Sequence, residues 1–210
     1  LETVMKIYLA NVDKYGVNNM IVLTPMIKSV TGVSALNKKI QKAVNPPSAN
    51  KPAIELKSGE ILRVGDRIIQ TKNNYEQEAV KDGNCILGVF NGDTGCIKDI
   101  DTFNGTVTVL FDDGKISTYK SSDAEQLQLA YAMSYHKSQG SEYRFVICAL
   151  TTADFVLLQR KILYTGATRG KEFVAFVGMA KAFQIAINNT NGDDRHTTLR
   201  NRLKEYSKIA

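Results

Sequence analysis

The feature that most constrains the fold is a change of pattern between about residues 54 and 122. Within this block, short runs of alternating apolar residues are separated by tight-turn dipeptides such as Asn91-Gly92 and Asp113-Gly114. One run alternates Val107, Val109 and Phe111, as a half-buried hairpin strand should. Several short strands with turns between them are typical of a small β-barrel. On both sides of the block, strand-like runs alternate with helical stretches, which favours an α/β layer around a parallel sheet. The strand-like runs include residues 18–26 and 127–133, and the helical stretches include residues 153–170 and 197–207.

The charge follows the same division. Residues 1–53 hold 7 basic and 2 acidic side chains, residues 54–123 hold 8 and 12, and residues 124–210 hold 12 and 7. The flanks are therefore basic and the middle is acidic, within a net charge of +6. Basic surface favours a phosphate backbone as partner, although ordinary solvated lysines give the same excess. We predict one α/β domain, 1–53 and 124–210, split by an inserted barrel at 54–123.

A dense polar segment, residues 134–142, lies between two apolar runs that are typical of buried strands. Ligands of open α/β sheets collect at loops beyond the carboxyl ends of strands, and this segment follows such a strand. Its hydroxyl, imidazole and ammonium groups suit phosphate oxygens, and they belong to Ser134, His136, Lys137 and Ser138. Gly140 allows close backbone approach, and Glu142 would accept a hydrogen bond from a sugar hydroxyl. A solvated loop with no ligand is the alternative.

Arg169 ends a helical stretch and precedes an apolar run. An arginine placed there can reach a γ-phosphate, where such residues raise the rate on the order of a thousandfold or more. The alternative is a surface arginine that favours the carboxyl end of a helix. The stretch from Gly166 to Lys171 is no phosphate-binding loop, because one residue is missing from its spacing and Glu172 replaces the required Ser or Thr.

Cysteine and histidine usage argues against a metal site. Cys85, Cys96 and Cys148 form no C-x-x-C pair, and the chain has only two histidines. An odd number of widely spaced cysteines favours a reducing compartment, so we expect a cytoplasmic protein whose thiols have no special role. The longest apolar runs are too short to span a bilayer.

Five segments together resemble the RecD-like superfamily-one DNA helicases, the family that includes the exodeoxyribonuclease V alpha subunit. "LAYAMSYHKSQGSEY" is similar to their motif V, and "LLQRKILYTGATRGKEFVAFVG" to motif VI, usually written Leu-Tyr-Thr-Ala-x-Thr-Arg-Ala-Lys. "IVLTPMIKSVTGVSALNKKIQKAVNP" resembles the motif IV region. "GDRIIQTKNNYE" and "GVFNGDTG" match the segments that lead into the family's inserted barrel. The resemblance implies a RecA-like domain of the P-loop NTPase type, with an SH3-like β-barrel inserted in it.

The resemblance also assigns roles by position. Arg169 matches the catalytic arginine of motif VI, and Gly140 and Glu142 match positions beside the ATP. Contacts to DNA are implied for Thr24, Pro25, Asn73, Asn74, Tyr75, Ser134, His136, Lys137 and Ser138. For Tyr75, packing is the alternative to base stacking.

This chain departs from the family pattern at three positions. Gly166 and Gly170 stand where alanine is usual, and Tyr135 stands where a smaller apolar residue is common. Two glycines would loosen a helix end by about 1 kcal/mol each, which bears on how firmly Arg169 is positioned.

The resemblance implies an ATP-dependent DNA helicase with 5′ to 3′ polarity. The chain starts at Leu1 and contains neither a Walker A nor a Walker B sequence, so we expect a fragment with no ATPase of its own. A preceding RecA-like domain would then supply the Mg²⁺ ligands. Expected partners are ATP, single-stranded and duplex DNA, that preceding domain, and other exonuclease-complex subunits, with no membrane. A non-catalytic nucleic-acid-binding module and a relaxase-type or viral-type helicase domain are the alternatives.

Overall fold

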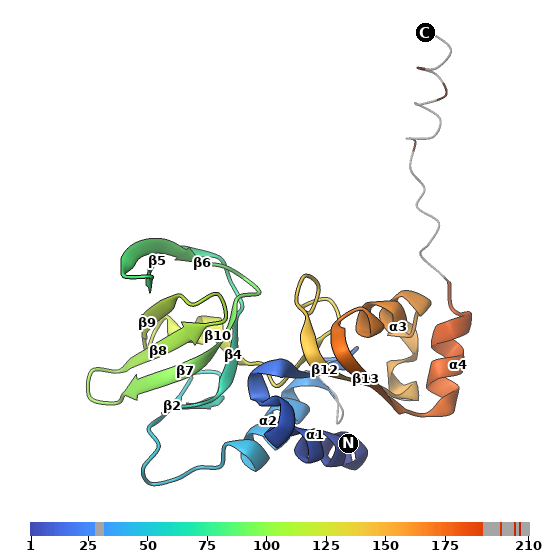
Figure 1. Ribbon diagram of the computed structural model, residues 1–210, viewed down its shortest axis with the longest axis horizontal. Coiled ribbons are helices and arrows are strands. Elements are labelled where there is room, and N and C mark those ends of the chain that lie inside the picture. The colour runs from blue at the N-terminus through green and yellow to red at the C-terminus, as the bar shows by residue number, and fades with distance from the viewer. Residues whose placement is uncertain (28–31, 191–197, 199–203, 205, 207–210) are drawn as a thin grey trace.

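The computed structural model describes residues 1–27, 32–190, 198, 204 and 206. Within these residues, four strands form a parallel sheet in the order β11-β1-β12-β13. Their bounds are Met20–Thr24 for β1, Ala132–Ser134 for β11, Tyr143–Leu150 for β12 and Gly170–Gly178 for β13. Figure 1 shows this sheet on one side of the molecule and an antiparallel sheet on the other. The predicted combination of a parallel α/β layer and an inserted β-structure is confirmed.

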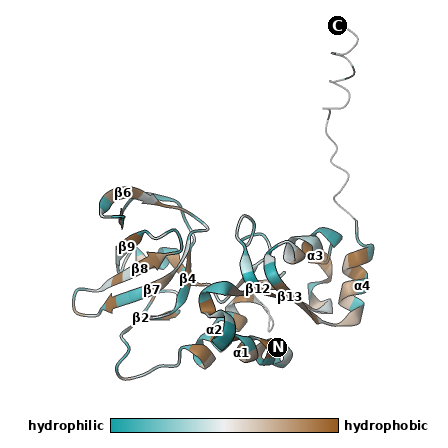
Figure 2. Cartoon of the chain, in the orientation of Figure 1, coloured by the Kyte–Doolittle hydropathy of each residue, from teal (hydrophilic) through white to brown (hydrophobic). Residues whose placement is uncertain are grey.

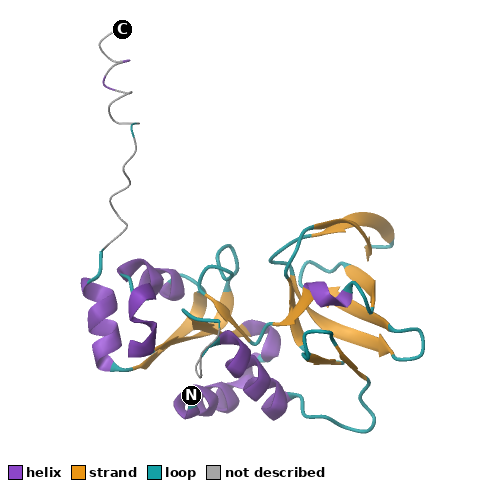
Figure 3. Cartoon of the chain, turned by 180° about the vertical axis from the view of Figure 1, so that it is seen from behind, coloured by secondary structure: helices purple, strands orange, loops and turns teal. Residues whose placement is uncertain are grey.

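Helices cover both faces of the parallel sheet (Figure 3). Side chains alternate along β1, where Met20 and Val22 face one buried cluster and Ile21 and Leu23 face another. The first cluster contains residues of α1, Glu2–Tyr15, and α2, Val33–Val44. The second contains residues of α3, Arg160–Ala167, and α4, Ala180–Asn188. Because both faces are covered, β1 reads as a continuous apolar run.

The antiparallel sheet comes from the middle of the chain. Among the described residues it has seven strands in the order β10-β4-β7-β8-β9-β5-β6, and we call it the barrel. Its strands are β4 Arg67–Gln70, β5 Asn74–Lys81, β6 Asn84–Val89, β7 Thr94–Asp101, β8 Thr106–Phe111, β9 Ile116–Lys120 and β10 Leu127–Leu129. A hairpin of β2, Ala53–Glu55, and β3, Ile61–Arg63, precedes it.

Local signals placed the barrel turns correctly. Gly92 and Gly114 adopt φ values of 101° and 88°, which favour glycine over residues with a side chain. The alternation along β8 is also confirmed, since Val107, Val109 and Phe111 are all buried. Figure 2 shows the hydropathy of each element and how apolar and polar residues are distributed along the strands.

Three short 3₁₀ helices complete the described secondary structure: η1 Val17–Asn19, η2 Ala124–Gln126 and η3 Thr152–Leu157. The helical stretch predicted from Ala153 to Gly170 is divided into η3 and α3. The break lies at Leu158 and Gln159, whose backbone is extended. A capping box begins η3, in which the Asp154 carboxylate accepts hydrogen bonds from the Thr151 hydroxyl and backbone N–H. The helix predicted at 197–207 lies almost wholly outside the described residues.

The apolar run from Leu127 to Met133, predicted as one strand of the α/β layer, is two strands. Leu127–Leu129 pairs with β4 in the barrel, and Ala132–Ser134 pairs with β1 in the parallel sheet. Only Ala130 and Tyr131 separate the two strands. The hydrophobic pattern is the same for both, because each buries its apolar side chains, and only the pairing tells them apart. The predicted division of the chain at 53 and 123 remains a prediction, and β10 lies beyond it.

Candidate functional site

Arg169 lies beside the end of the polar segment. Strand β13 begins at Gly170, and its register with β12 sets Gly170 opposite Tyr143. The Tyr143 backbone N–H donates to the Arg169 carbonyl at 2.8 Å. The Arg169 Nη1 donates to the carbonyl oxygen of Ser141 at 3.1 Å. Strand pairing therefore brings the guanidinium to the stretch between Gly140 and Glu142, so these three residues lie close enough to contact one ligand.

The guanidinium of Arg169 has only neutral partners. Its Nη2 lies 3.2 Å from the Thr168 hydroxyl oxygen, and its Nε is buried with no hydrogen-bond partner among the described residues. Bonds from a guanidinium to neutral oxygens are weaker than bonds to a phosphate or carboxylate. No acidic group within the described residues forms a salt bridge with Arg169, so its charge is available to an anion.

Two ion pairs join the strands next to Arg169. The Lys171 Nζ lies 3.1 Å from a Glu142 carboxylate oxygen, and the Arg144 Nε lies 2.5 Å from a Glu172 oxygen. The hydrogen bond from Arg144 lowers the pKa of Glu172. All four side chains are well exposed, so each pair contributes little to stability. The charge of Glu172, which sequence analysis set against a phosphate at this position, is thus already balanced by Arg144.

The loop itself is held by internal hydrogen bonds. Ser138 is fully buried, and its hydroxyl donates to the Tyr135 carbonyl at 2.7 Å. Gly140 has a φ of 88° and no atom within 4 Å of where a Cβ would stand, so glycine serves the turn and leaves open space above it. Ser138 therefore stabilises the loop in this conformation, and its side chain does not face solvent.

The residues predicted to contact DNA are divided between two places. Thr24 and Ser134 are register partners at the carboxyl ends of β1 and β11, with Pro25 next to them. His136 and Lys137 follow in the exposed part of the loop, and partial burial lowers the pKa of Lys137. The Arg169 group lies at the amino ends of β12 and β13 instead. The polar segment thus begins at the carboxyl edge of the sheet and ends at the amino edge, contrary to the expectation that all of it lies at the carboxyl edge.

Asn73, Asn74 and Tyr75 lie in the barrel, away from the parallel sheet. Asn73 Oδ1 accepts from the Asn91 N–H at 2.9 Å, and Asn74 Nδ2 lies 3.3 Å from Gln126 Oε1. The Tyr75 ring packs edge-on against Phe90 with centroids 5.6 Å apart, yet it is 68% exposed. The Tyr75 ring thus packs against Phe90 and still leaves much of its surface exposed to solvent.

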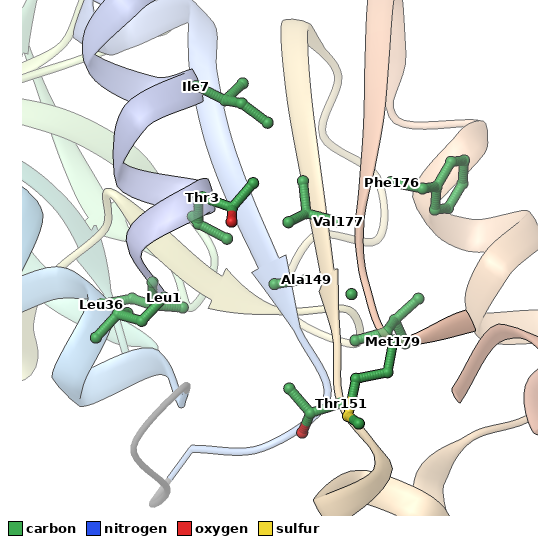
Figure 4. Close-up of a pocket in the computed structure, with 12 residues that line it drawn as sticks. Leu1, Thr3, Ile7, Leu36, Ala149, Thr151, Phe176, Val177 and Met179 are labelled. Carbon is green, nitrogen blue, oxygen red and sulfur yellow. The ribbon is translucent and has the colours of Figure 1, made fainter. Parts of the chain in front are cut away.

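Two hollows lie beside the sheet, and sequence reasoning found neither. A polar cleft of about 310 Å³ separates the loop at Ser141–Tyr143 from the barrel residues Arg67 and Asp112, which form a bidentate ion pair. A more apolar groove of about 470 Å³ lies between α1 and the carboxyl ends of β12 and β13 (Figure 4). Its walls come from segments more than a hundred residues apart, so no local pattern could have indicated it.

The described residues contain no group of three or more His, Cys, Asp or Glu side chains that could hold a metal ion. Among the helices of the described part of the chain, none has the length and apolar character needed to cross a membrane.

Gly166 packs closely against two buried side chains, Cys148 and Tyr135. A Cβ at Gly166 would lie 2.5 Å from Cys148 Sγ and 2.9 Å from the Tyr135 ring, so these two side chains together leave room for a glycine only. Burial raises the pKa of Cys148 to about 12, which leaves this thiol protonated and packed. Gly170 is the first residue of β13 and not part of the helix. The expected loosening of the helix end by two glycines is therefore wrong for Gly170.

Gly166→Ala is expected to destabilise the protein by about 1–3 kcal/mol, the usual range for an overpacked core. The methyl group would overlap Tyr135 and Cys148. Adding Cys148→Ala removes the sulfur that lies nearest to the new methyl group and is expected to recover part of the loss. The thermal unfolding midpoint of both variants measures this. A double variant no more stable than Gly166→Ala would show that the Cys148 sulfur is not the obstacle.

Comparisons with known proteins find matches both for the barrel and for part of the parallel-sheet domain. Residues 36–111 match the family described as the ATP-dependent RecD-like DNA helicase SH3 domain, and residues 129–177 match the UvrD-like helicase C-terminal domain. A solved structure of Pif1 helicases described as unwinding forked DNA aligns with a TM-score of 0.50 at 18% identity, covering 92% of this chain and 45% of that one. At this identity the likeness shows the fold alone, which is a RecA-like α/β domain with an SH3-like insertion.

Curated relatives match over most of this chain. The ATP-dependent RecD2 DNA helicase of Deinococcus radiodurans is 33% identical over 185 residues, which are 88% of this chain and 23% of that protein. The RecBCD enzyme subunit RecD of Mycolicibacterium smegmatis is 36% identical over 141 residues, or 67% of this chain and 22% of that protein. The chain thus spans about a quarter of the length of these relatives. It belongs to the RecD-like helicase family and carries the RecD-like SH3 domain and a UvrD-like helicase C-terminal domain.

Proposed function

We propose that this chain is the C-terminal motor part of an ATP-dependent DNA helicase and that Arg169 is its arginine finger. The observation that carries the proposal is the position of Arg169 at one sheet edge with Gly140 and Glu142, bonded only to neutral oxygens. A γ-phosphate offers this guanidinium an anionic partner that the described residues do not supply. The gain in hydrogen-bond strength on that exchange would favour closure of the cleft on ATP.

ATP hydrolysis needs a second domain to complete the nucleotide site. In this proposal ATP lies between the edge that carries Arg169 and the preceding RecA-like domain, which also supplies the Mg²⁺ ligands. Glu142 lies next to this edge, where its carboxylate can exchange the exposed Lys171 for a ribose hydroxyl. Hydrolysis and loss of the γ-phosphate would remove the partner of Arg169 and reopen the cleft.

DNA contact is proposed for the other edge of the same loop. Thr24, Pro25 and Ser134 end the two neighbouring strands there, and the exposed His136 and Lys137 follow. Because one loop joins the two edges, movement at Arg169 is linked to movement at the strand ends. We further propose that translocation runs 5′ to 3′ and that Tyr75 offers its free ring face to a base.

The full-length protein is expected to hydrolyse ATP with stimulation by single-stranded DNA and to unwind duplexes with a 5′ single-stranded tail. The isolated 210-residue chain is expected to show no ATP turnover above a mock purification, because it contains neither a Walker A nor a Walker B sequence. Phosphate release and strand-displacement assays on both proteins measure this. Binding of DNA by the full-length protein without any hydrolysis would favour a non-catalytic binding module.

A further inference from the structure

Helix α2 presents a row of buried amide side chains. Asn37, Gln41 and Asn45 are spaced by four residues, so they lie along one face of the helix and its carboxyl end. Each is at most 5% exposed, while Leu36 and Ile40 enter the apolar core beside them. Buried amides in native proteins have hydrogen-bond partners, and the partners of these three show what the row holds together.

Asn37 holds the connection that leaves the barrel. Its Nδ2 donates to the carbonyl oxygens of Leu129 at 2.9 Å and Ala132 at 3.0 Å, and its Oδ1 accepts from the Ala132 N–H at 2.7 Å. Leu129 is the last residue of a barrel strand, and Ala132 is the first residue of a strand in the parallel sheet. One side chain therefore fixes both ends of a two-residue connection.

Gln41 and Asn45 hold the connection that enters the barrel. Gln41 Nε2 donates to the Ile61 carbonyl at 2.8 Å, and Asn45 Nδ2 donates to the Val64 carbonyl at 3.1 Å. Both amides also donate to the carboxylate of Asp66, which lies just before β4. Both chain crossings between the two sheets are thus bound to the same helix.

Asp66 joins the two connections to each other. Its carboxylate is fully buried and also accepts from the Arg63 N–H at 2.7 Å and from the Tyr131 hydroxyl at 2.9 Å. Tyr131 belongs to the outgoing connection, and its carbonyl accepts from the Val22 N–H of the central strand at 3.1 Å. A chain of hydrogen bonds therefore runs from the turn before β4, through Asp66 and Tyr131, to the parallel sheet.

Apolar packing supports the same junction independently. A single cluster of buried side chains contains Val22 and Leu36 on the sheet side, and Ile68, Ile97 and Leu129 on the barrel side. Domains joined by small polar interfaces move relative to one another by default. Here the junction has a continuous apolar core, a two-residue outgoing connection and a buried polar network, each of which opposes such movement.

We infer that Asn37, Gln41, Asn45 and Asp66 are positioning residues that lock the barrel to the parallel sheet, so that both move as one rigid body. The inference rests on the proposed function for its consequence in the motor cycle. A DNA strand held by the barrel would be displaced together with Arg169, and the step would arise wholly at the cleft with the preceding domain.

Distance measurements between two spin labels test this in the full-length protein. Lys120→Cys in β9 and Lys181→Cys in α4 are exposed label sites, one on each side of the junction. Cys85→Ser and Cys96→Ser remove the accessible thiols, and Cys148 is buried. The label distance is expected to have one narrow distribution, unchanged by a non-hydrolysable ATP analogue or by single-stranded DNA.

Variants of the amides on α2 test whether these side chains hold the barrel and the parallel sheet together. Asn37→Ala combined with Gln41→Ala removes side-chain hydrogen bonds to both connections and is expected to broaden the distribution. Gln77→Ala is the matched control, because that amide bonds only within the barrel, to the Ser117 hydroxyl at 2.9 Å and the Thr118 carbonyl at 3.1 Å. It is expected to leave the distribution narrow. If the double variant fails to fold, Asn37→Asp, which keeps the shape but loses both donors, carries the same expectation.

A distance that shifts when nucleotide or DNA binds would overturn the rigid-body inference. If folded Asn37 and Gln41 variants keep a narrow label-distance distribution, these side chains are not what holds the junction rigid. The measurement needs no hydrolysis, so a protein that does not turn over ATP would refute the proposed helicase activity and leave the distance result standing.

Discussion

Arg169→Ala in the full-length protein is expected to lower ATP turnover by about a thousandfold or more, the range found for arginine fingers. Binding of single-stranded DNA is expected to persist, because the DNA contacts are proposed for the opposite edge of the sheet. The side chain bonds only to the Ser141 carbonyl and the Thr168 hydroxyl, so its removal is expected to leave the fold intact. Single-turnover and steady-state hydrolysis, with DNA binding measured on the same preparation, check this.

Arg160→Ala is the matched control for Arg169→Ala. Arg160 is the first residue of helix α3, which ends two residues before Arg169, and its Nε also donates to a neutral backbone carbonyl, that of Ile187, at 3.0 Å. Its loss is expected to leave turnover unchanged. Arg169→Lys keeps the charge but not the planar fork of donors, and it is expected to restore only part of the activity. Turnover of Arg169→Ala within a few fold of the natural protein would rule out the finger.

Asp66→Ala is expected to destabilise the junction between barrel and sheet by roughly 2–6 kcal/mol. The Arg63 N–H and the Tyr131 hydroxyl would each lose the partner seen here, and each buried donor left without one costs about 1–3 kcal/mol. The amides of Gln41 and Asn45 keep their second acceptors, the carbonyls of Ile61 and Val64, so their loss is smaller.

Hydrogen exchange at the junction measures the effect of Asp66→Ala within the full-length protein. A loss of 2 kcal/mol corresponds to roughly a 30-fold faster exchange of the Val22 and Ala132 amides. Asp101→Ala removes an exposed carboxylate that accepts three hydrogen bonds in a barrel turn, and it is expected to leave those amides unchanged. Equal exchange in the Asp66 and Asp101 variants would show that Asp66 does not hold the junction.

The amino-acid sequence indicated the local structure and the chemistry of the loop. Alternation along residues 106–111 and the two turn glycines predicted the barrel hairpins, and the apolar run at 20–24 predicted a short buried strand. Resemblance of two segments to helicase motifs singled out Arg169 and the polar segment. These signals are local, since side-chain periodicity and turn preference depend only on neighbouring residues.

The tertiary structure decided which of these residues meet. The sequence predicted one strand from Leu127 to Met133, but strand pairing divides it, with Leu127–Leu129 in the barrel and Ala132–Ser134 in the parallel sheet. The register of β12 with β13 likewise brought Arg169 to Ser141, and the approach of helix α2 to both connections created the buried site of Asp66. The physical reason is that periodicity reports whether a side chain is buried, whereas its partner depends on strand register and helix packing between residues far apart in the chain.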